Sequence, residues 1–316
     1  MAPRRKRVHR LRLIDTHHHI LPPFYVQALG ADAIAAGLGG VPAWSPETSL
    51  AAMDRYGIDA AVASISNPGI AVNDRKKAAA LARQCNDFAK EMSVQHPGRF
   101  DAFAVLPMPD VDASLAEIKR ALDDLRLAGI GLLTNYLGAY LGDPQFKPVL
   151  EELHRRKAVV FVHPTLAPSA PFRSLLPPPL VEFPHDTTWA IMSLITSGAF
   201  SRYPDIKFLF SHAGGTMLSI GLRFQFIKDA SGGDSLALLK RSYYDVALSA
   251  TPLTVPALLS FVGSSQVVFG SDYPFVPQSV LEVFGEYLAK LATERQDVFP
   301  LIERETALTL FPHLRR

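Results

Sequence analysis

Short apolar runs alternate with longer amphipathic segments along the whole chain. The runs are apolar at nearly every position, as in Val159-Val-Phe-Val162, which is typical of strands covered on both faces in a parallel sheet. The longer segments have helical length, and one opens at Ser45-Pro46-Glu47, a helix-start signal with serine as N-cap. The pattern predicts strands at residues 11–15, 60–66, 100–106, 129–134, 158–162, 206–211, 243–248 and 266–270. It predicts helices at residues 45–56, 73–95, 111–128, 145–156, 186–201, 216–229, 252–262 and from 278 onward.

Eight strand–helix units follow one another in 316 residues without a break in composition. This repetition predicts an α/β fold of the (β/α)8 TIM-barrel class. We expect one barrel domain over residues 11–316, with loop insertions such as the proline-rich stretch 167–184. An open doubly wound sheet is the alternative, but no glycine-rich phosphate-binding sequence follows the first strand.

Basic residues concentrate at the N-terminus, although the net charge of the chain is only +2. We interpret residues 1–10 as a solvated basic tail rather than a nucleic-acid-binding arm, because no other basic stripe with interleaved aromatic residues occurs. Cys85 is the single cysteine, which excludes a disulfide framework, and no apolar run approaches the length of a membrane span. We therefore expect a cytoplasmic protein that binds neither nucleic acid nor a membrane. We also expect a homo-oligomer, namely a dimer.

Three histidines follow the first predicted strand. If the strand alternation continues through Asp15-Thr-His-His-His19, then Asp15, His17 and His19 share one face and His18 points away. Two imidazoles on one face at a strand end can bind one metal ion. We therefore expect His17 and His19 to be ligands and His18 to be structural.

Other predicted strand ends carry further metal-binding residue types. His163 and His212 end the fifth and sixth strands, and Asp272 follows the eighth. In a barrel these carboxyl ends meet on one face, where catalytic side chains gather. Two histidines, a third histidine and an aspartate can form a mononuclear site with an open position. Asp245 lies within a predicted strand. Its side chain either supports this site or makes a buried hydrogen bond with a structural role only.

Four motifs together resemble the amidohydrolase-related metal-dependent decarboxylases, the group of aminocarboxymuconate semialdehyde and resorcylate decarboxylases. They are Asp15-Thr-His-His-His, Val162-His-Pro, Ser211-His-Ala-Gly-Gly and Gly270-Ser-Asp-Tyr-Pro. Further stretches, Leu132-Leu-Thr-Asn-Tyr, Tyr140-Leu-Gly-Asp-Pro and Phe183-Pro-His-Asp-Thr-Thr, resemble the 6-methylsalicylate decarboxylase branch.

The resemblance implies roles for individual residues. His17, His19, His163 and Asp272 would bind the metal, His212 would be a catalytic histidine, and Asp272 would also deliver the proton. The fourth predicted strand ends at Thr134-Asn135-Tyr136, without the lysine that bridges two metals in many hydrolytic relatives. We therefore expect one divalent metal, zinc or alternatively manganese.

The expected reaction is non-oxidative decarboxylation of a small hydroxylated aromatic acid. A metal-dependent lactone or amide hydrolase is the alternative, since the ligand set does not separate the two, and a non-enzymatic binding module is a third interpretation. Aromatic side chains near the strand ends are candidate pocket walls, although core packing explains each of them as well. The candidate substrate-binding residues are Phe24, Trp44, Asn135, Phe183, Trp189, Tyr273 and Phe275.

Overall fold

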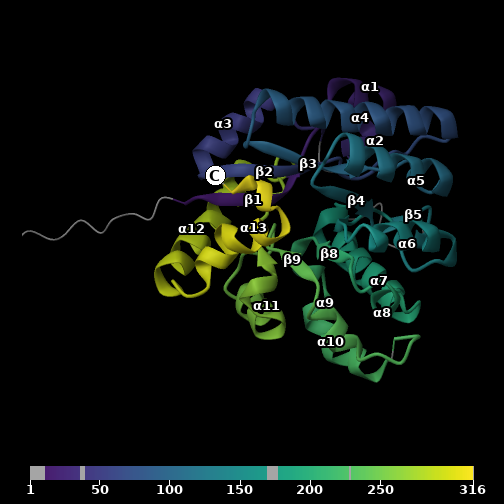
Figure 1. Ribbon diagram of the computed structural model, residues 1–316. Coiled ribbons are helices and arrows are strands. Elements are labelled where there is room, and N and C mark those ends of the chain that lie inside the picture. The colour runs from purple at the N-terminus through teal and green to yellow at the C-terminus, as the bar shows by residue number, and fades with distance from the viewer. Residues whose placement is uncertain (1–10, 36–39, 169–176, 228, 316) are drawn as a thin grey trace, which may run out of the picture.

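Eight parallel strands form one sheet in the computed structural model, which describes residues 11–35, 40–168, 177–227 and 229–315 (Figure 1). The strands follow chain order around the sheet, and the two short strands β5 (Asn135–Tyr136) and β6 (Ala139–Tyr140) form a separate hairpin. Backbone bonds join β1 to the segment after β10, among them Thr16 N–H to Phe269 O at 3.0 Å and His19 N–H to Tyr273 O at 2.7 Å. These bonds close the sheet into a (β/α)8 barrel, so the predicted fold class is confirmed and the open sheet is excluded. The strands are β1 (Leu13–His19), β2 (Ile58–Ser64), β3 (Phe100–Val105), β4 (Gly129–Leu133), β7 (Val159–His163), β8 (Lys207–Phe210), β9 (Tyr243–Asp245) and β10 (Val267–Val268).

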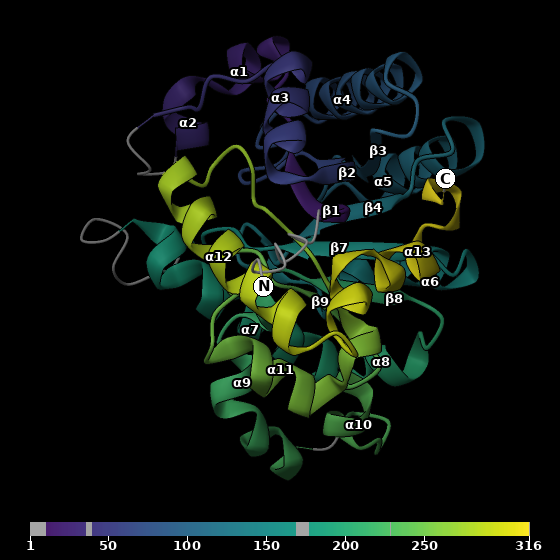
Figure 2. The same cartoon turned by 90° about the vertical axis from the view of Figure 1, so that its left-hand side faces the viewer.

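Helices surround the strands, with α3 and α4 on one side of the molecule and α9 to α11 on the opposite side (Figure 2). The helix predicted after Ser45 begins at Pro46, and the Ser45 side chain accepts a hydrogen bond from Thr48 N–H as an N-cap. The helices are α1 (Pro23–Leu29), α2 (Ala31–Ala35), α3 (Pro46–Tyr56), α4 (Arg75–Gln95), α5 (Val111–Lys119), α6 (Lys147–Arg155), α7 (Glu182–Thr196), α8 (Ala199–Arg202), α9 (Met217–Ile220), α10 (Ser235–Leu239), α11 (Thr254–Val262), α12 (Gln278–Glu294) and α13 (Thr306–Leu310).

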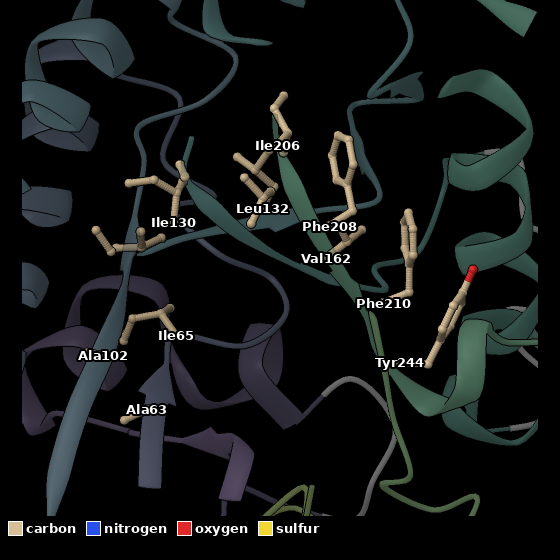
Figure 3. Packing of buried hydrophobic residues seen from close by; sticks show 14 of the residues in the cluster. Ala63, Ile65, Ala102, Ile130, Leu132, Val162, Ile206, Phe208, Phe210 and Tyr244 are labelled. Carbon is tan, nitrogen blue, oxygen red and sulfur yellow. The ribbon is translucent and has the colours of Figure 1, made fainter. Parts of the chain in front are cut away.

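The apolar core has two layers, one inside the barrel and one between strands and helices. Side chains on the outer face of neighbouring strands, such as Leu132, Val162 and Phe208, pack together in the layer toward the helices (Figure 3). The inner layer contains Phe103 and Phe161, and Phe311 from the end of the chain packs edge-on against Phe103. The C-terminal segment therefore covers the amino end of the barrel and leaves the carboxyl end for the site.

Three predicted helices differ from the observed ones. The helix predicted at 186–201 begins earlier, at Glu182, because Pro184 lies in the first turn, where a missing N–H costs nothing. It ends at Thr196, shortly before Gly198, which has a φ of 74°. In place of one helix predicted at 216–229, the structure has the short helix α9 and then a 3-10 helix, Gly221–Phe226. The helix predicted at 111–128 ends at Lys119 and continues as one π-helical turn.

Two further predictions concern the N-terminal tail and the membrane. The basic tail, residues 1–10, lies outside the described residues. Among the helices that are described, none combines the length and the apolar character needed to cross a bilayer.

Candidate metal centre and active site

Four side chains from three strand ends converge at the carboxyl end of the barrel. His17 and His19 come from β1, His163 ends β7, and Asp272 follows β10. The Nε2 atoms of His17 and His19 are 3.0 Å apart, and Asp272 Oδ1 lies 3.3 Å from the first and 3.1 Å from the second. One ligand atom from each of the four residues lies within 4.8 Å of the others, and all four side chains are buried. Among the described residues, no other group of three or more His, Cys, Asp or Glu side chains is placed to hold a metal ion.

The outer nitrogen of each histidine is already bonded. His17 Nδ1 contacts Asp245 Oδ2 at 2.9 Å, and His163 Nδ1 contacts Pro164 O at 2.8 Å. His19 Nδ1 contacts Ser64 Oγ at 2.9 Å, while that hydroxyl donates to His18 O. Because the oxygens accept these bonds, each ring carries a proton on Nδ1, and Nε2 is the nitrogen that can bind a metal ion once it carries no proton. Three such Nε2 atoms and a carboxylate oxygen fit a divalent cation.

The same charges shift the pKa values of the cluster. Burial lowers the pKa of His17, but the carboxylates of Asp245 and Asp272 outweigh burial and raise it to about 10. Burial lowers the pKa of His19 to about 4, and burial beside the other histidines holds the pKa of His163 well below its ordinary value. Burial alone would raise the pKa of Asp272, yet His17 and the hydrogen bonds hold it well below the usual range. Asp272 is therefore a carboxylate here.

His212 lies beside the cluster, with its Nε2 3.4 Å from Asp272 Oδ2 and its ring centroid 4.8 Å from that of His17. Its backbone N–H donates to Asp245 Oδ1 at 3.0 Å. Asp245 thus accepts hydrogen bonds from both the His17 ring and the His212 backbone. Of the two roles considered for Asp245, these bonds favour support of the site.

His18 points away from the cluster, as the alternation predicts. Its Nδ1 lies 3.0 Å from Asp15 Oδ2, its Nε2 lies 3.0 Å from Ser49 Oγ, and its ring stacks on Tyr273. The expectation that Asp15 faces the same way as His17 and His19 is wrong, because the pairing of β1 with β2 shifts register between Asp15 and His18. Asp15 instead accepts from Ser271 N–H at 3.0 Å and so holds the segment that carries Asp272.

A cavity of about 460 Å³ opens beside His163, His212 and Asp272. Apart from these three residues, its lining is mostly apolar, and among the described residues no lysine or arginine lines it. The other lining residues are Ile34, Ser66, Asn67, Pro179, Leu180, Phe183, Pro184, Gly215, Leu248, Ser249, Phe275, Val276, Pro277 and Val280.

Two of the seven candidate substrate-binding residues lie at this cavity. Phe183 and Phe275 line it, and Phe275 packs edge-on against His19 at 5.6 Å between ring centroids. The other five lie elsewhere. Phe24 packs on Phe88, Trp44 donates to Ser49 Oγ, Asn135 donates to Asp186, Tyr273 stacks on His18, and Trp189 is 62% exposed on α7.

A buried carboxylate on α7 was not anticipated from the sequence. Asp186 accepts hydrogen bonds from Thr134 Oγ1, from Asn135 Nδ2 at 3.0 Å and from Tyr140 OH at 2.7 Å. It ties α7 to the end of β4, next to the loop that leaves His163. The one signal in the sequence was an acid amid the apolar and hydroxyl residues of a predicted helix start, which is also common at ordinary helix N-termini.

A closed (β/α)8 barrel with three histidines and an aspartate gathered at its carboxyl end defines a metal-site enzyme scaffold. This chain belongs to the amidohydrolase family, whose sequence model, described as Amidohydrolase, matches residues 14–312.

Named relatives narrow the comparison. Decarboxylase yanB from Aspergillus niger is 36% identical over 323 residues, which cover 96% of this chain and 88% of the relative. The 6-methylsalicylic acid decarboxylase of Penicillium expansum is 34% identical over 328 residues, 96% of this chain and 97% of the relative. The crystal structure of dihydroxybenzoic acid decarboxylase from Polaromonas sp. JS666, with bound manganese and the inhibitor 2-nitroresorcinol, superposes with a TM-score of 0.84 at 21% identity over 96% of this chain and 98% of that one. The last likeness supports the fold alone.

Proposed function

We propose that this chain is a metal-dependent, non-oxidative decarboxylase of a small hydroxylated aromatic acid of the 6-methylsalicylate type. The observation that carries the proposal is the His17–His19–His163–Asp272 cluster at the edge of an apolar cavity of about 460 Å³. The names of the relatives over nearly the full chain favour a carboxy-lyase over the hydrolase alternative.

His17, His19, His163 and Asp272 would hold one divalent metal ion, zinc or alternatively manganese. When bound, this ion supplies a Lewis acid that orients the substrate and draws charge from its ring. Three imidazole nitrogens and one carboxylate oxygen suit either metal, and outer partners such as Asp245 and Ser64 fix the ring orientations. Phe183 and Phe275 would form apolar walls for the aromatic ring.

The reaction moves one proton to carbon. The ring carbon that bears the carboxylate gains the proton, the bond to the carboxylate breaks, its electron pair restores the aromatic ring, and CO2 leaves. Asp272 is the proton donor in this proposal. Because Asp272 is a carboxylate in the site, it must receive that proton from a neighbour, and His212 Nε2 at 3.4 Å from Oδ2 is placed to provide it.

Turnover of 6-methylsalicylate in D2O tests this function. We expect CO2 release and one deuterium on the ring carbon that lost the carboxylate, detected by mass spectrometry. Asp272→Asn keeps the shape and a carbonyl oxygen but carries no transferable proton, so turnover should fall far more than metal content. Incorporation of solvent oxygen into an acid product, without CO2, would instead establish the hydrolase.

The remaining expectations stay predictions. Elemental analysis should give about one metal ion per chain, and two would contradict a mononuclear site. A homodimer and a cytoplasmic location rest on the sequence alone.

A further inference from the structure

We propose that Asp186 is a positioning residue for His163, on which it acts through the hydroxyl of Thr134 and the turn that follows β7. The inference rests on the proposed role of His163 as a metal ligand. It adds the buried interaction, one helix away from the cluster, that sets the direction of the His163 ring.

The carboxylate of Asp186 is bound by a neighbouring segment of the barrel. An acid near the start of a helix ordinarily interacts with the free N–H groups of that helix. The Asp186 side chain accepts instead from the Thr134 hydroxyl, from Asn135 Nδ2 at 3.0 Å and from Tyr140 OH at 2.7 Å. All three donors belong to the end of β4 and to the β5–β6 hairpin. Asp186 and Thr134 are both buried, so water does not replace their hydrogen bond.

Thr134 holds the turn after β7 at two points. Its backbone N–H donates to His163 O at 3.0 Å, and its Oγ1 accepts the Thr165 N–H at 3.0 Å. A hydroxyl has one hydrogen and a carboxylate only accepts, so Asp186 takes that hydrogen and leaves an oxygen lone pair for Thr165. The charged acceptor also polarises the hydroxyl, which strengthens its bond to the Thr165 N–H. Asp186 therefore fixes the Thr134 hydroxyl in the state that holds the turn.

The turn in its place directs the imidazole ring. His163 Nδ1 donates to Pro164 O at 2.8 Å. This carbonyl and the Thr165 N–H belong to one planar peptide group, so the bond that fixes the N–H also fixes the carbonyl. The Thr165 hydroxyl adds a further restraint, because it donates to Asn67 Oδ1. Without the Thr134 contact the peptide group can rotate, and the ring then loses the acceptor that keeps its proton on Nδ1 and its Nε2 free for a metal.

Chelator competition with Zn2+ on the full-length protein tests the proposal. Asp186→Asn keeps the shape but presents an N–H to one of its donors. It should weaken Zn2+ binding roughly 10-fold, the lower end of the range for outer partners of a metal ligand. Thr134→Val removes the hydroxyl at nearly constant volume and should weaken binding as much, whereas Thr134→Ser should keep wild-type affinity. Because both residues act in one chain of contacts, the double variant Asp186→Asn/Thr134→Val should bind Zn2+ no more weakly than the weaker single variant.

Tyr140→Phe is the matched control. It removes another hydrogen bond to the same carboxylate but leaves the Thr134 hydroxyl in place. The temperature of unfolding should fall in this variant as it does in Asp186→Asn, while Zn2+ affinity stays near wild type.

Nitrogen NMR of the metal-free protein reports the ring directly. The signals of His163 are those that disappear in His163→Ala. We expect the proton on Nδ1 in the wild type and in Tyr140→Phe, and a mixture of the two neutral tautomers in Asp186→Asn. A residue with a structural role alone would lower the temperature of unfolding without changing this tautomer.

The outcomes separate this inference from the proposed function. Wild-type Zn2+ affinity or an unchanged His163 tautomer in folded Asp186→Asn overturns the positioning role, and additive losses in the double variant overturn action through Thr134. If Asp186→Asn does not fold, wild-type affinity in Thr134→Val overturns the role instead. Wild-type Zn2+ affinity in His163→Ala overturns the proposed ligand and this inference with it. Absence of CO2 from 6-methylsalicylate in the zinc-loaded wild type would overturn the proposed reaction alone.

Discussion

Gly270 lies directly against His17 of the candidate metal cluster, and replacing this glycine with alanine should damage the site. An added Cβ would lie 2.7 Å from His17 Cβ and 3.2 Å from the Cβ atoms of Ala247 and Asp245. Nonbonded carbons prefer about 3.5–4.0 Å. His17 or the Gly270 backbone must therefore move by roughly 1 Å, the difference between that range and the close approach.

A displacement of this size matters because Asp245 positions His17 and because His17 Nε2 must stay close to the other ligand atoms. Its Nδ1 is 2.9 Å from Asp245 and its Nε2 is 3.0 Å from His19 Nε2. Metal–ligand distances tolerate about 0.2 Å, and loss of outer support typically costs about 10- to 100-fold in metal affinity or activity. Overpacking of a tight interior costs about 1–3 kcal/mol of folding free energy.

The assay compares Gly270→Ala with Gly131→Ala. In β4, an added Cβ at Gly131 lies 3.5 Å from Phe103 Cβ, an ordinary contact. Metal affinity by chelator competition, kcat/KM, and the free energy of unfolding should all fall for Gly270→Ala and stay near wild type for Gly131→Ala. A Gly270→Ala protein with wild-type metal affinity and kcat/KM would refute the reasoning.

The remaining predictions concern the ligands and the tail. His17→Ala should lose the metal while His18→Ala retains it, measured by elemental analysis after dialysis; the reverse result would show that the strand phase is wrong. Because the pKa of His17 is raised to about 10 in the metal-free site, the ring is protonated below that pH and metal must displace the proton. Affinity should then rise about tenfold per pH unit between about pH 6 and 9, and a flat profile in chelator titrations would contradict this. Deletion of residues 1–10 should leave activity and melting temperature unchanged, since this basic segment has little apolar surface to bury.

The convergence of His17, His19, His163 and Asp272 could be predicted because two features of the sequence mark each strand end. Continuous apolar runs give the strands, and His163 and Asp272 stand where a proline or glycine turn ends the run. In a repeating strand–helix chain these equivalent positions meet on one face, so residues far apart in sequence could be assigned to one site.

The pocket walls could not be predicted in the same way. Whether an aromatic residue faces the cavity depends on loops that cross from other strands, and no periodicity records this. Trp44 illustrates the difficulty, because its indole N–H is committed to Ser49 at 2.9 Å on α3. Asn67 is the opposite case: as an asparagine before a proline it reads as an ordinary turn, and only the contact with Thr165 reveals a fixed amide at the cavity.

Backbone strain at the carboxyl end links the fold to its use. His212, Ala213 and Asp272 have φ values of 53°, 55° and 58°, and non-glycine residues pay roughly 1–3 kcal/mol each for such conformations. The surroundings hold them there: Asp245 accepts the His212 N–H at 3.0 Å, and His17 O accepts the Asp272 N–H at 2.8 Å. Asp245 and His17 therefore fix both the cluster and the strained backbone that carries its partners. For this reason, loss of Asp245 should displace His17 and His212 together.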